Sequence, residues 1–84
     1  MDVQAEISIY PLRTKSLSEA IDEFCAILCN YGLEIKTTSM STLISGDSTE
    51  IFSACEKAFE QLSCKYHIVM NMKISNACPS DGLN

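Results

Sequence analysis

The chain changes between two kinds of hydrophobic periodicity in a fixed order, and this order limits the folds open to it. Residues 5–10 alternate apolar and polar side chains, with Ile7 and Ile9 on one face and Tyr10 on the other. This two-residue period predicts a strand. Because Pro11 cannot donate a hydrogen bond to a neighbouring strand, we expect the strand to end there.

The following segment has the spacing of a helix. Ser16 or Ser18 can cap its first turn, and Gly32 suits the left-handed position that often closes a helix. Its apolar residues recur every three or four positions: Leu17, Ile21, Phe24, Cys25, Leu28 and Tyr31.

Two short runs, residues 33–38 and 40–45, come next and are rich in Ile and Thr, which favour strands. The few residues around Thr38, Ser39 and Met40 leave room only for a tight connection, so the two runs should form a hairpin. Gly46 is expected to stop its second arm.

A second helix and a last strand complete the pattern. Asp47 or Ser48 can cap the helix, and Asp47 with Glu50 has the spacing of a capping box. The predicted apolar stripe of this helix comprises Ile51, Cys55, Ala58, Phe59 and Leu62. Residues 66–74 read as the strand, and the tail that follows contains Pro79 and Gly82.

The order β-α-β-β-α-β predicts an α+β fold of one domain over residues 1–84, with an ordered core of about residues 4–76 and a tail at 77–84. With right-handed crossovers, this order gives a ferredoxin-like arrangement: a four-stranded antiparallel sheet of strand order 4-1-3-2, with both helices on one face. The other face should carry Tyr10, His67, Val69 and Asn71. It is less polar than a solvated face, which favours a homo-oligomer.

The charge and hydropathy of the chain exclude several partners. Eleven acidic against six basic residues give a formal net charge of -5, which argues against nucleic acid because phosphate binding needs clustered Lys and Arg. No stretch is long or apolar enough to span a bilayer, and no basic-then-apolar leader is visible at the N-terminus. We therefore expect a cytoplasmic protein.

Five cysteines without paired spacing do not describe a disulfide framework. Cys25 and Cys29 lie one helical turn apart, but no CxxC or second histidine completes a metal site, since His67 is the only histidine. We expect reduced, mostly buried cysteines and no metal.

No catalytic group of residues is visible. The chain has no Gly-rich phosphate loop and no Ser/His/Asp set. Cys64 and His67 could form a nucleophile and base, but residues three apart near a strand start usually point in different directions. We expect no enzyme and keep this pair as the catalytic alternative.

Small polar side chains gather on the predicted strands, where Ser and Thr are common in any case. They are Ser8, Thr37, Thr38, Ser39, Ser41, Thr42 and Asn71. The first and third strands should be neighbours, so Ser8 or Ile9 would lie close to Thr42. Hydroxyls among apolar residues suit a pocket for a flat heterocycle.

Several segments resemble the YkoF-like thiamine/hydroxymethylpyrimidine-binding family. They are residues 5–12 (AEISIYPL), 39–47 (SMSTLISGD), 67–71 (HIVMN) and 76–81 (NACPSD). Single-domain members share the pattern M-x-T-x-x-x-G-[DE], which Met40, Thr42, Gly46 and Asp47 supply here. Those members often have Gly-Pro where this chain has Thr38-Ser39.

The resemblance implies a non-catalytic ferredoxin-like protein that forms dimers or tetramers through its sheet and needs no cofactor. It also implies a pocket for the aminopyrimidine half of thiamine, contacted by Thr42 and by the backbone near Ser8 and Ile9. Ser41 and Asn71 complete the expected ligand-binding set. We therefore predict a cytoplasmic homodimer or homotetramer that binds thiamine or hydroxymethylpyrimidine, and the alternative is a structural or regulatory oligomer without a small-molecule ligand.

Overall fold

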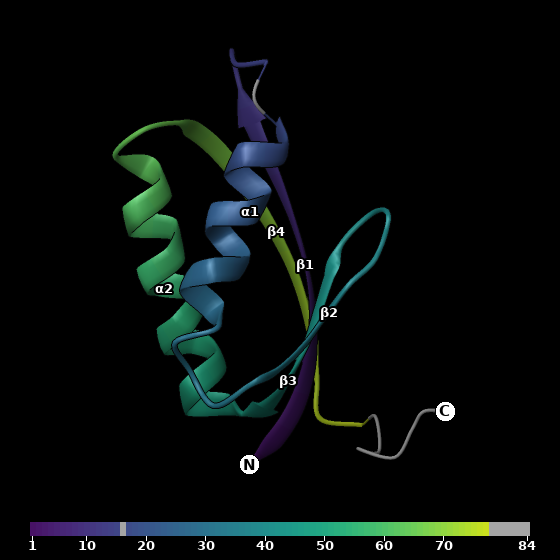
Figure 1. The fold of residues 1–84 in the computed structure, drawn as a ribbon. Helices are drawn as coiled ribbons and strands as arrows, with labels where there is room; N and C mark the ends of the chain where they lie inside the picture. Colours follow the sequence, from purple (N-terminus) through teal and green to yellow (C-terminus); the bar gives the residue numbers. More distant parts are fainter. Residues whose placement is uncertain (16, 78–84) are drawn as a thin grey trace.

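Six elements follow one another in the order strand, helix, strand, strand, helix, strand. The computed structural model describes residues 1–15 and 17–77. Its elements are β1 (Asp2–Leu12), α1 (Leu17–Leu28), β2 (Glu34–Thr37), β3 (Thr42–Asp47), α2 (Ser48–Ser63) and β4 (His67–Ser75). The strands form one antiparallel sheet in the order β2-β3-β1-β4, and both helices lie on one side of it (Figure 1). The predicted ferredoxin-like α+β fold and its 4-1-3-2 strand order are confirmed.

Strand β1 lies in the middle of the sheet and separates the core from the open face. Its odd-numbered residues Val3, Ala5, Ile7 and Ile9 are buried beneath the helices. The even-numbered residues alternate with them and point to the other side, as the pleat requires. This side of the sheet, which carries no helix, is called the open face below.

The helices bury one stripe each. The buried residues of α1 are Ala20, Phe24, Ile27 and Leu28, and those of α2 are Ile51, Ala54, Cys55, Ala58 and Leu62. Two predicted members are wrong, because Leu17 and Phe59 are exposed. Leu17 lies in the first turn, before α1 is fully covered. Phe59 lies at the edge of the buried stripe of α2. The small residues Ala54 and Ala58 allow this stripe to pack close to the sheet.

The ends of several elements also differ from the prediction. Strand β1 continues through Pro11, which pairs with Ile68 of β4. The pairing of β1 with β3 stops at Ile7, so beyond that point β1 has a neighbour on one side only and a missing N–H is tolerated. Strand β3 likewise continues through Gly46, whose φ of +156° lies outside the region that other residues favour.

Helix α1 closes without a left-handed glycine. Gly32 is not among the residues of positive φ in the described part of the chain. Instead the helix tightens at its end, where the N–H groups of Asn30 and Tyr31 donate to the carbonyls of Ile27 and Leu28, each at 3.1 Å. The predicted caps at Ser16 or Ser18 involve one residue, Ser16, that lies outside the described residues.

Asp47 caps α2, as predicted, and its carboxylate accepts a hydrogen bond from the Thr49 N–H at 3.1 Å. Hydrogen bonds from the N-terminal ammonium group and from Thr49 hold the pKa of Asp47 below its ordinary value. No capping box forms, because the carboxylate of Glu50 instead lies 3.5 Å from the N–H of Gly32. Neither helix of the described chain has the length and apolar character needed to cross a membrane.

The thiols of the described residues are all unpaired, but they are not mostly buried as predicted. Cys55 is buried and Cys25 half-buried, whereas Cys29 and Cys64 are exposed at the ends of the two helices. Cys78 lies outside the described residues.

Adjacent residues of α2 provide a test of the packing. Ile51 is 0% exposed and Phe52 is 52% exposed. We expect Ile51→Ala to lower the free energy of unfolding by about 2–5 kcal/mol, because it leaves a cavity in the core. Phe52→Ala removes more atoms, yet it should cost under ~1 kcal/mol. Urea denaturation measures both, and equal costs would contradict the described orientation of α2.

Burial should also separate the reactivities of the cysteines. Burial raises the pKa of the Cys55 thiol from 9.0 to about 11. At pH 8 the reactive thiolate is then about a hundredfold scarcer than at an unshifted thiol. We expect iodoacetamide to modify Cys29 and Cys64 rapidly in the folded protein, and Cys55 only after unfolding. Mass spectrometry of peptides reads this out, and rapid modification of native Cys55 would show that the core is open.

Candidate ligand-binding site

A cavity of about 250 Å³ lies where the β2–β3 hairpin leaves β1. Its lining comes from β1, α1 and the end of the hairpin: Ile7, Ser8, Ile9, Tyr10, Leu17, Ile21, Phe24, Thr37, Thr38, Ser39, Met40, Ser41 and Thr42. Drug-sized ligands usually occupy ~300–1,000 Å³, so this cavity suits a single ring better than a large molecule.

The inner walls of the cavity are apolar. Ile7 and Ile9 of β1 and Phe24 of α1 are buried core residues that also line it. Helix α1 adds Ile21 and the exposed Leu17. A flat heterocycle placed among these side chains would remove apolar surface from water on both of its faces.

Thr42 brings a polar group into this apolar site. The residue is only 4% exposed and pairs with Ile7 at the start of β3. Within residues 1–15 and 17–77 its hydroxyl has no hydrogen-bond partner, and no fully enclosed side-chain oxygen or nitrogen is left unpaired. The hydroxyl of Thr42 is therefore open to the cavity and can bond a ligand.

The hairpin loop, residues 38–41, forms the outer wall of the cavity and is closed by Thr38. The Thr38 N–H donates to the Ser41 carbonyl at 2.8 Å. The Thr38 hydroxyl oxygen accepts from the N–H groups of Ser41 at 3.0 Å and of Met40 at 3.3 Å. This is the local side-chain-to-backbone bonding by which Thr and Ser stabilise turns.

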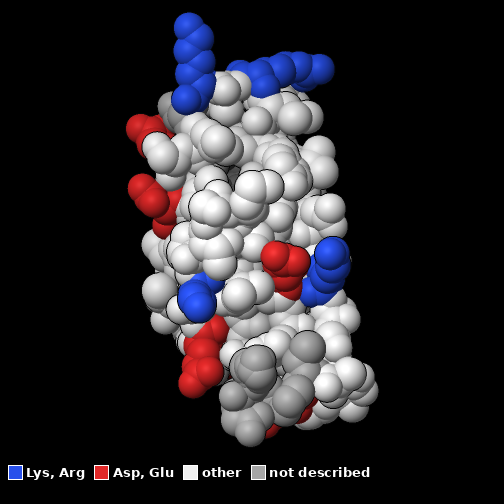
Figure 2. Space-filling model, turned by 90° about the vertical axis from the view of Figure 1, so that its right-hand side faces the viewer, with Lys and Arg blue, Asp and Glu red and all other residues white. Residues whose placement is uncertain are grey.

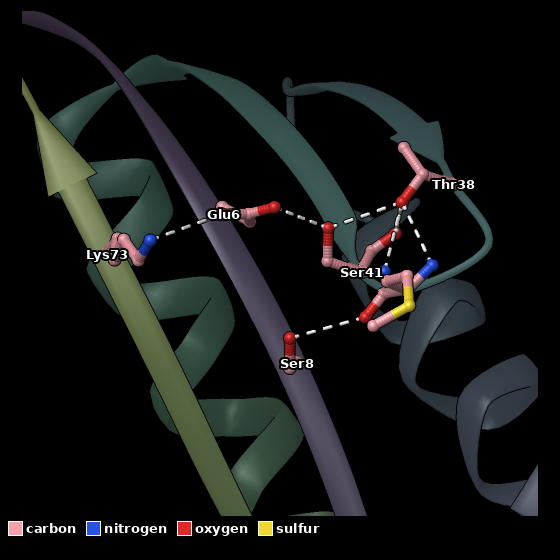
Figure 3. Close-up of polar contacts among 6 residues, drawn as sticks. Glu6, Ser8, Thr38, Ser41 and Lys73 are labelled. Carbon is pink, nitrogen blue, oxygen red and sulfur yellow. Dashed lines mark hydrogen bonds and ion pairs between the residues drawn. The ribbon is translucent and has the colours of Figure 1, made fainter.

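Two side chains of β1 reach this loop from the open face (Figure 3). The Ser41 hydroxyl donates to Glu6 Oε2 at 2.8 Å, and the Ser8 hydroxyl donates to the Met40 carbonyl at 3.4 Å. The other oxygen of the Glu6 carboxylate, Oε1, lies 4.0 Å from the ammonium group of Lys73 on β4.

The structure brings together four of the five predicted ligand residues. Ser8, Ile9, Ser41 and Thr42 all line the cavity. Asn71 does not, because it is an exposed residue of β4, which pairs with β1 on the edge opposite the hairpin. The α1 wall was not predicted as part of the site, since its residues carry the same helical spacing as any core stripe.

The open face has a second, wider hollow of about 520 Å³ over β2, β3, β1 and β4. Tyr10 and Val69 are register partners near one end of this face and are 50% and 49% exposed. Leu12 and Leu43 are exposed on the same face. Figure 2 shows this side of the molecule, and most of the surface in view is uncharged.

The predicted catalytic alternative receives no geometric support in the described chain. Cys64 caps the end of α2, and its thiol contacts the Glu60 carbonyl at 3.6 Å rather than an imidazole. Among residues 1–15 and 17–77, no group of three or more His, Cys, Asp or Glu side chains could hold a metal ion.

Comparison with known proteins places the chain in a family. Residues 2–81 match the family described as YKOF-related. The chain belongs to this YkoF-related family, as the resemblance predicted. It is also similar to the UPF0045 protein MJ1052 of Methanocaldococcus jannaschii, with 32% identity over 74 residues that cover 86% of this chain and 74% of that protein.

Solved structures agree with the fold. The crystal structure of the hypothetical protein MJ1052 has a TM-score of 0.84 at 29% identity and covers 99% of this chain and 86% of its own. A proposed thiamine biosynthesis/salvage protein of Thermotoga maritima, TM0486, has a TM-score of 0.83 at 19% identity and covers 100% of this chain and 90% of its own. At that identity the second likeness shows the fold alone.

Proposed function

We propose that this YkoF-related protein binds thiamine or its hydroxymethylpyrimidine moiety in the hairpin cavity, without catalysis and as a homo-oligomer. The observation that carries the proposal is the unpartnered hydroxyl of Thr42 inside an apolar cavity of about 250 Å³. A ligand that fills the cavity excludes water from this hydroxyl, so a ligand that also bonds the hydroxyl is favoured over an apolar one that leaves it unpaired.

The chemistry of an aminopyrimidine matches this environment. Its ring is flat and has apolar faces for Ile9 and Phe24, while its ring nitrogens and amino group can pair with the Thr42 hydroxyl. The negative charge of the chain favours the cationic thiazolium half of thiamine at long range. The match to the YkoF-related family and the thiamine-related description of the Thermotoga protein support the same ligand.

The lining of the cavity favours binding over reaction. Tyr10 is its one titratable side chain among the described residues, and the rest are apolar, hydroxyl or thioether groups. General acid–base catalysis needs a group that titrates near the working pH, commonly His, Asp or Glu. The role would then be to hold or deliver the ligand. The unpaired thiols of the described chain fit the cytoplasm, where thiols stay reduced.

The open face supports the oligomeric part of the proposal. Tyr10 and Val69 lie side by side on it, each about half exposed, and no helix of the described chain covers them. A second copy of the sheet would remove these side chains from water. The same observation favours the alternative function, an oligomer without a small-molecule ligand, so the two functions must be separated by ligand binding.

Removal of the Thr42 hydroxyl tests the ligand site. We expect Thr42→Val to weaken binding of hydroxymethylpyrimidine or thiamine by about 1–3 kcal/mol, measured by isothermal titration calorimetry. Thr49→Val is the matched control, since Thr49 lies in the first turn of α2 and outside the cavity. Asn71→Ala asks whether the open face takes part, and the cavity geometry predicts unchanged affinity. Absence of binding heat for both ligands at millimolar concentration would contradict the ligand site and favour the alternative function, an oligomer without a small-molecule ligand.

A charge on the open face tests the oligomer. We expect Val69→Lys to shift the protein from oligomer to monomer in light scattering, because it places an unpaired ammonium group where a second copy would pack. Ser53→Lys on the exposed side of α2 adds the same charge and should leave the mass unchanged. A monomeric wild-type protein, or an unaffected Val69→Lys variant, would contradict assembly through this face.

A further inference from the structure

The hairpin loop that walls the cavity lies outside the backbone ladders of the sheet. The pairing of β1 with β3 ends at Ile7 and Thr42, and that of β2 with β3 ends at Thr37 and Thr42. Residues 38–41 therefore have no strand beside them, and the tip of the hairpin turns away from β1 (Figure 1). Hydrogen bonds to the Thr38 hydroxyl fix the internal shape of the loop, but these bonds lie within the loop and do not reach β1.

Side chains of β1 supply the missing attachment. Of the two bonds that join β1 to the loop, the one from the Ser41 hydroxyl to the Glu6 carboxylate is shorter, at 2.8 Å against 3.4 Å for Ser8 to the Met40 carbonyl. It is also assisted by charge, and such bonds are the stronger ones. Glu6 is thus the main anchor between the middle of the sheet and the loop (Figure 3).

Glu6 does not itself line the cavity. As an even-numbered residue of β1 it faces the open side, where it pairs in register with Leu43 and Lys73. Apart from its share in the long-range negative charge of the chain, which Glu34 also carries, Glu6 reaches the cavity through Ser41 and the loop.

From these contacts we infer that Glu6 is a positioning residue for the ligand site: its carboxylate holds the hairpin loop against β1 and so sets the shape of the cavity from the opposite face of the sheet. The inference rests on the proposed function, because it assigns a role in the same site. Without this bond the loop samples more positions, and a ligand must then select or order the competent one.

The first test is binding. We expect Glu6→Ala to raise the Kd for hydroxymethylpyrimidine or thiamine about 5–20-fold, the size of effect expected for one ordinary hydrogen bond, because the Glu6 side chain is 45% exposed and water screens its charge. Glu6→Gln keeps an oxygen that accepts from Ser41 and should recover most of the affinity. Glu34→Ala is the matched control: Glu34 also lies on the open face and accepts from a serine, Ser45 at 3.4 Å, but that serine is in a strand. Its affinity should stay within about twofold of the wild type.

The second test needs no ligand. In the free protein, Glu6→Ala should speed the solvent exchange of the Met40 and Ser41 amides, measured by NMR, whereas Glu34→Ala should not. Ser41→Ala removes the same bond and also the 3.3 Å contact between the Ser41 and Thr38 hydroxyls, so it should give at least as large an increase. The double variant should exchange no faster than Ser41→Ala alone, because Glu6 then has no remaining partner in the loop. The Ser41→Ala variant keeps the test valid if Glu6→Ala fails to fold.

The outcomes separate the two proposals. A wild-type protein that binds neither ligand overturns the proposed function, while the exchange experiment still decides whether Glu6 holds the loop. Loop exchange that is unchanged in both Glu6→Ala and Ser41→Ala overturns the positioning role. An affinity that falls equally in Glu6→Ala and Glu34→Ala overturns it as well.

Discussion

The alternation of side chains along β1 is the constraint on which the rest of the structure depends. The strand pairs with β3 along part of one edge and with β4 along the other, and its two faces carry different sets of side chains. Its odd-numbered residues build the core beneath the helices, and two of them, Ile7 and Ile9, continue as the floor of the cavity. Its even-numbered residues Glu6 and Ser8 reach the hairpin loop from the other side.

The order and type of the elements could be predicted because they follow from local periods. A two-residue period buries alternate residues of a strand, and a 3.6-residue period buries one stripe of a helix, whatever lies next to them. The ends of elements could not be predicted in the same way. Pro11 and Gly46 usually stop strands, but each lies inside one here, because its effect depends on which neighbouring strand is present at that point.

The candidate site, too, could be predicted only in part. The sequence placed Ser8, Ile9 and Thr42 near one another because β1 and β3 are neighbours in this fold. It could not assign faces, since a shift of one residue in register exchanges the two sides of a strand. The observed register pairs Thr42 with Ile7, which places both residues on the helix side of the sheet and leaves Ser8 on the open face. Asn71 lies on β4, on the opposite edge of β1 from the hairpin, and the strand order therefore keeps it away from the cavity.

The position of Glu6 has a consequence if the protein assembles through its open face, as proposed above. Its carboxylate lies on the face that a second copy would cover, while its bond partner Ser41 lines the cavity. Cover by another subunit would exclude water from around this bond and strengthen it. Thermodynamic linkage then requires the effect to be reciprocal: assembly would raise the affinity for ligand, and ligand would favour assembly by the same factor. A concentrated protein would bind its ligand more tightly than a dilute one, and the sheet would carry cooperativity between its two faces without any change of fold.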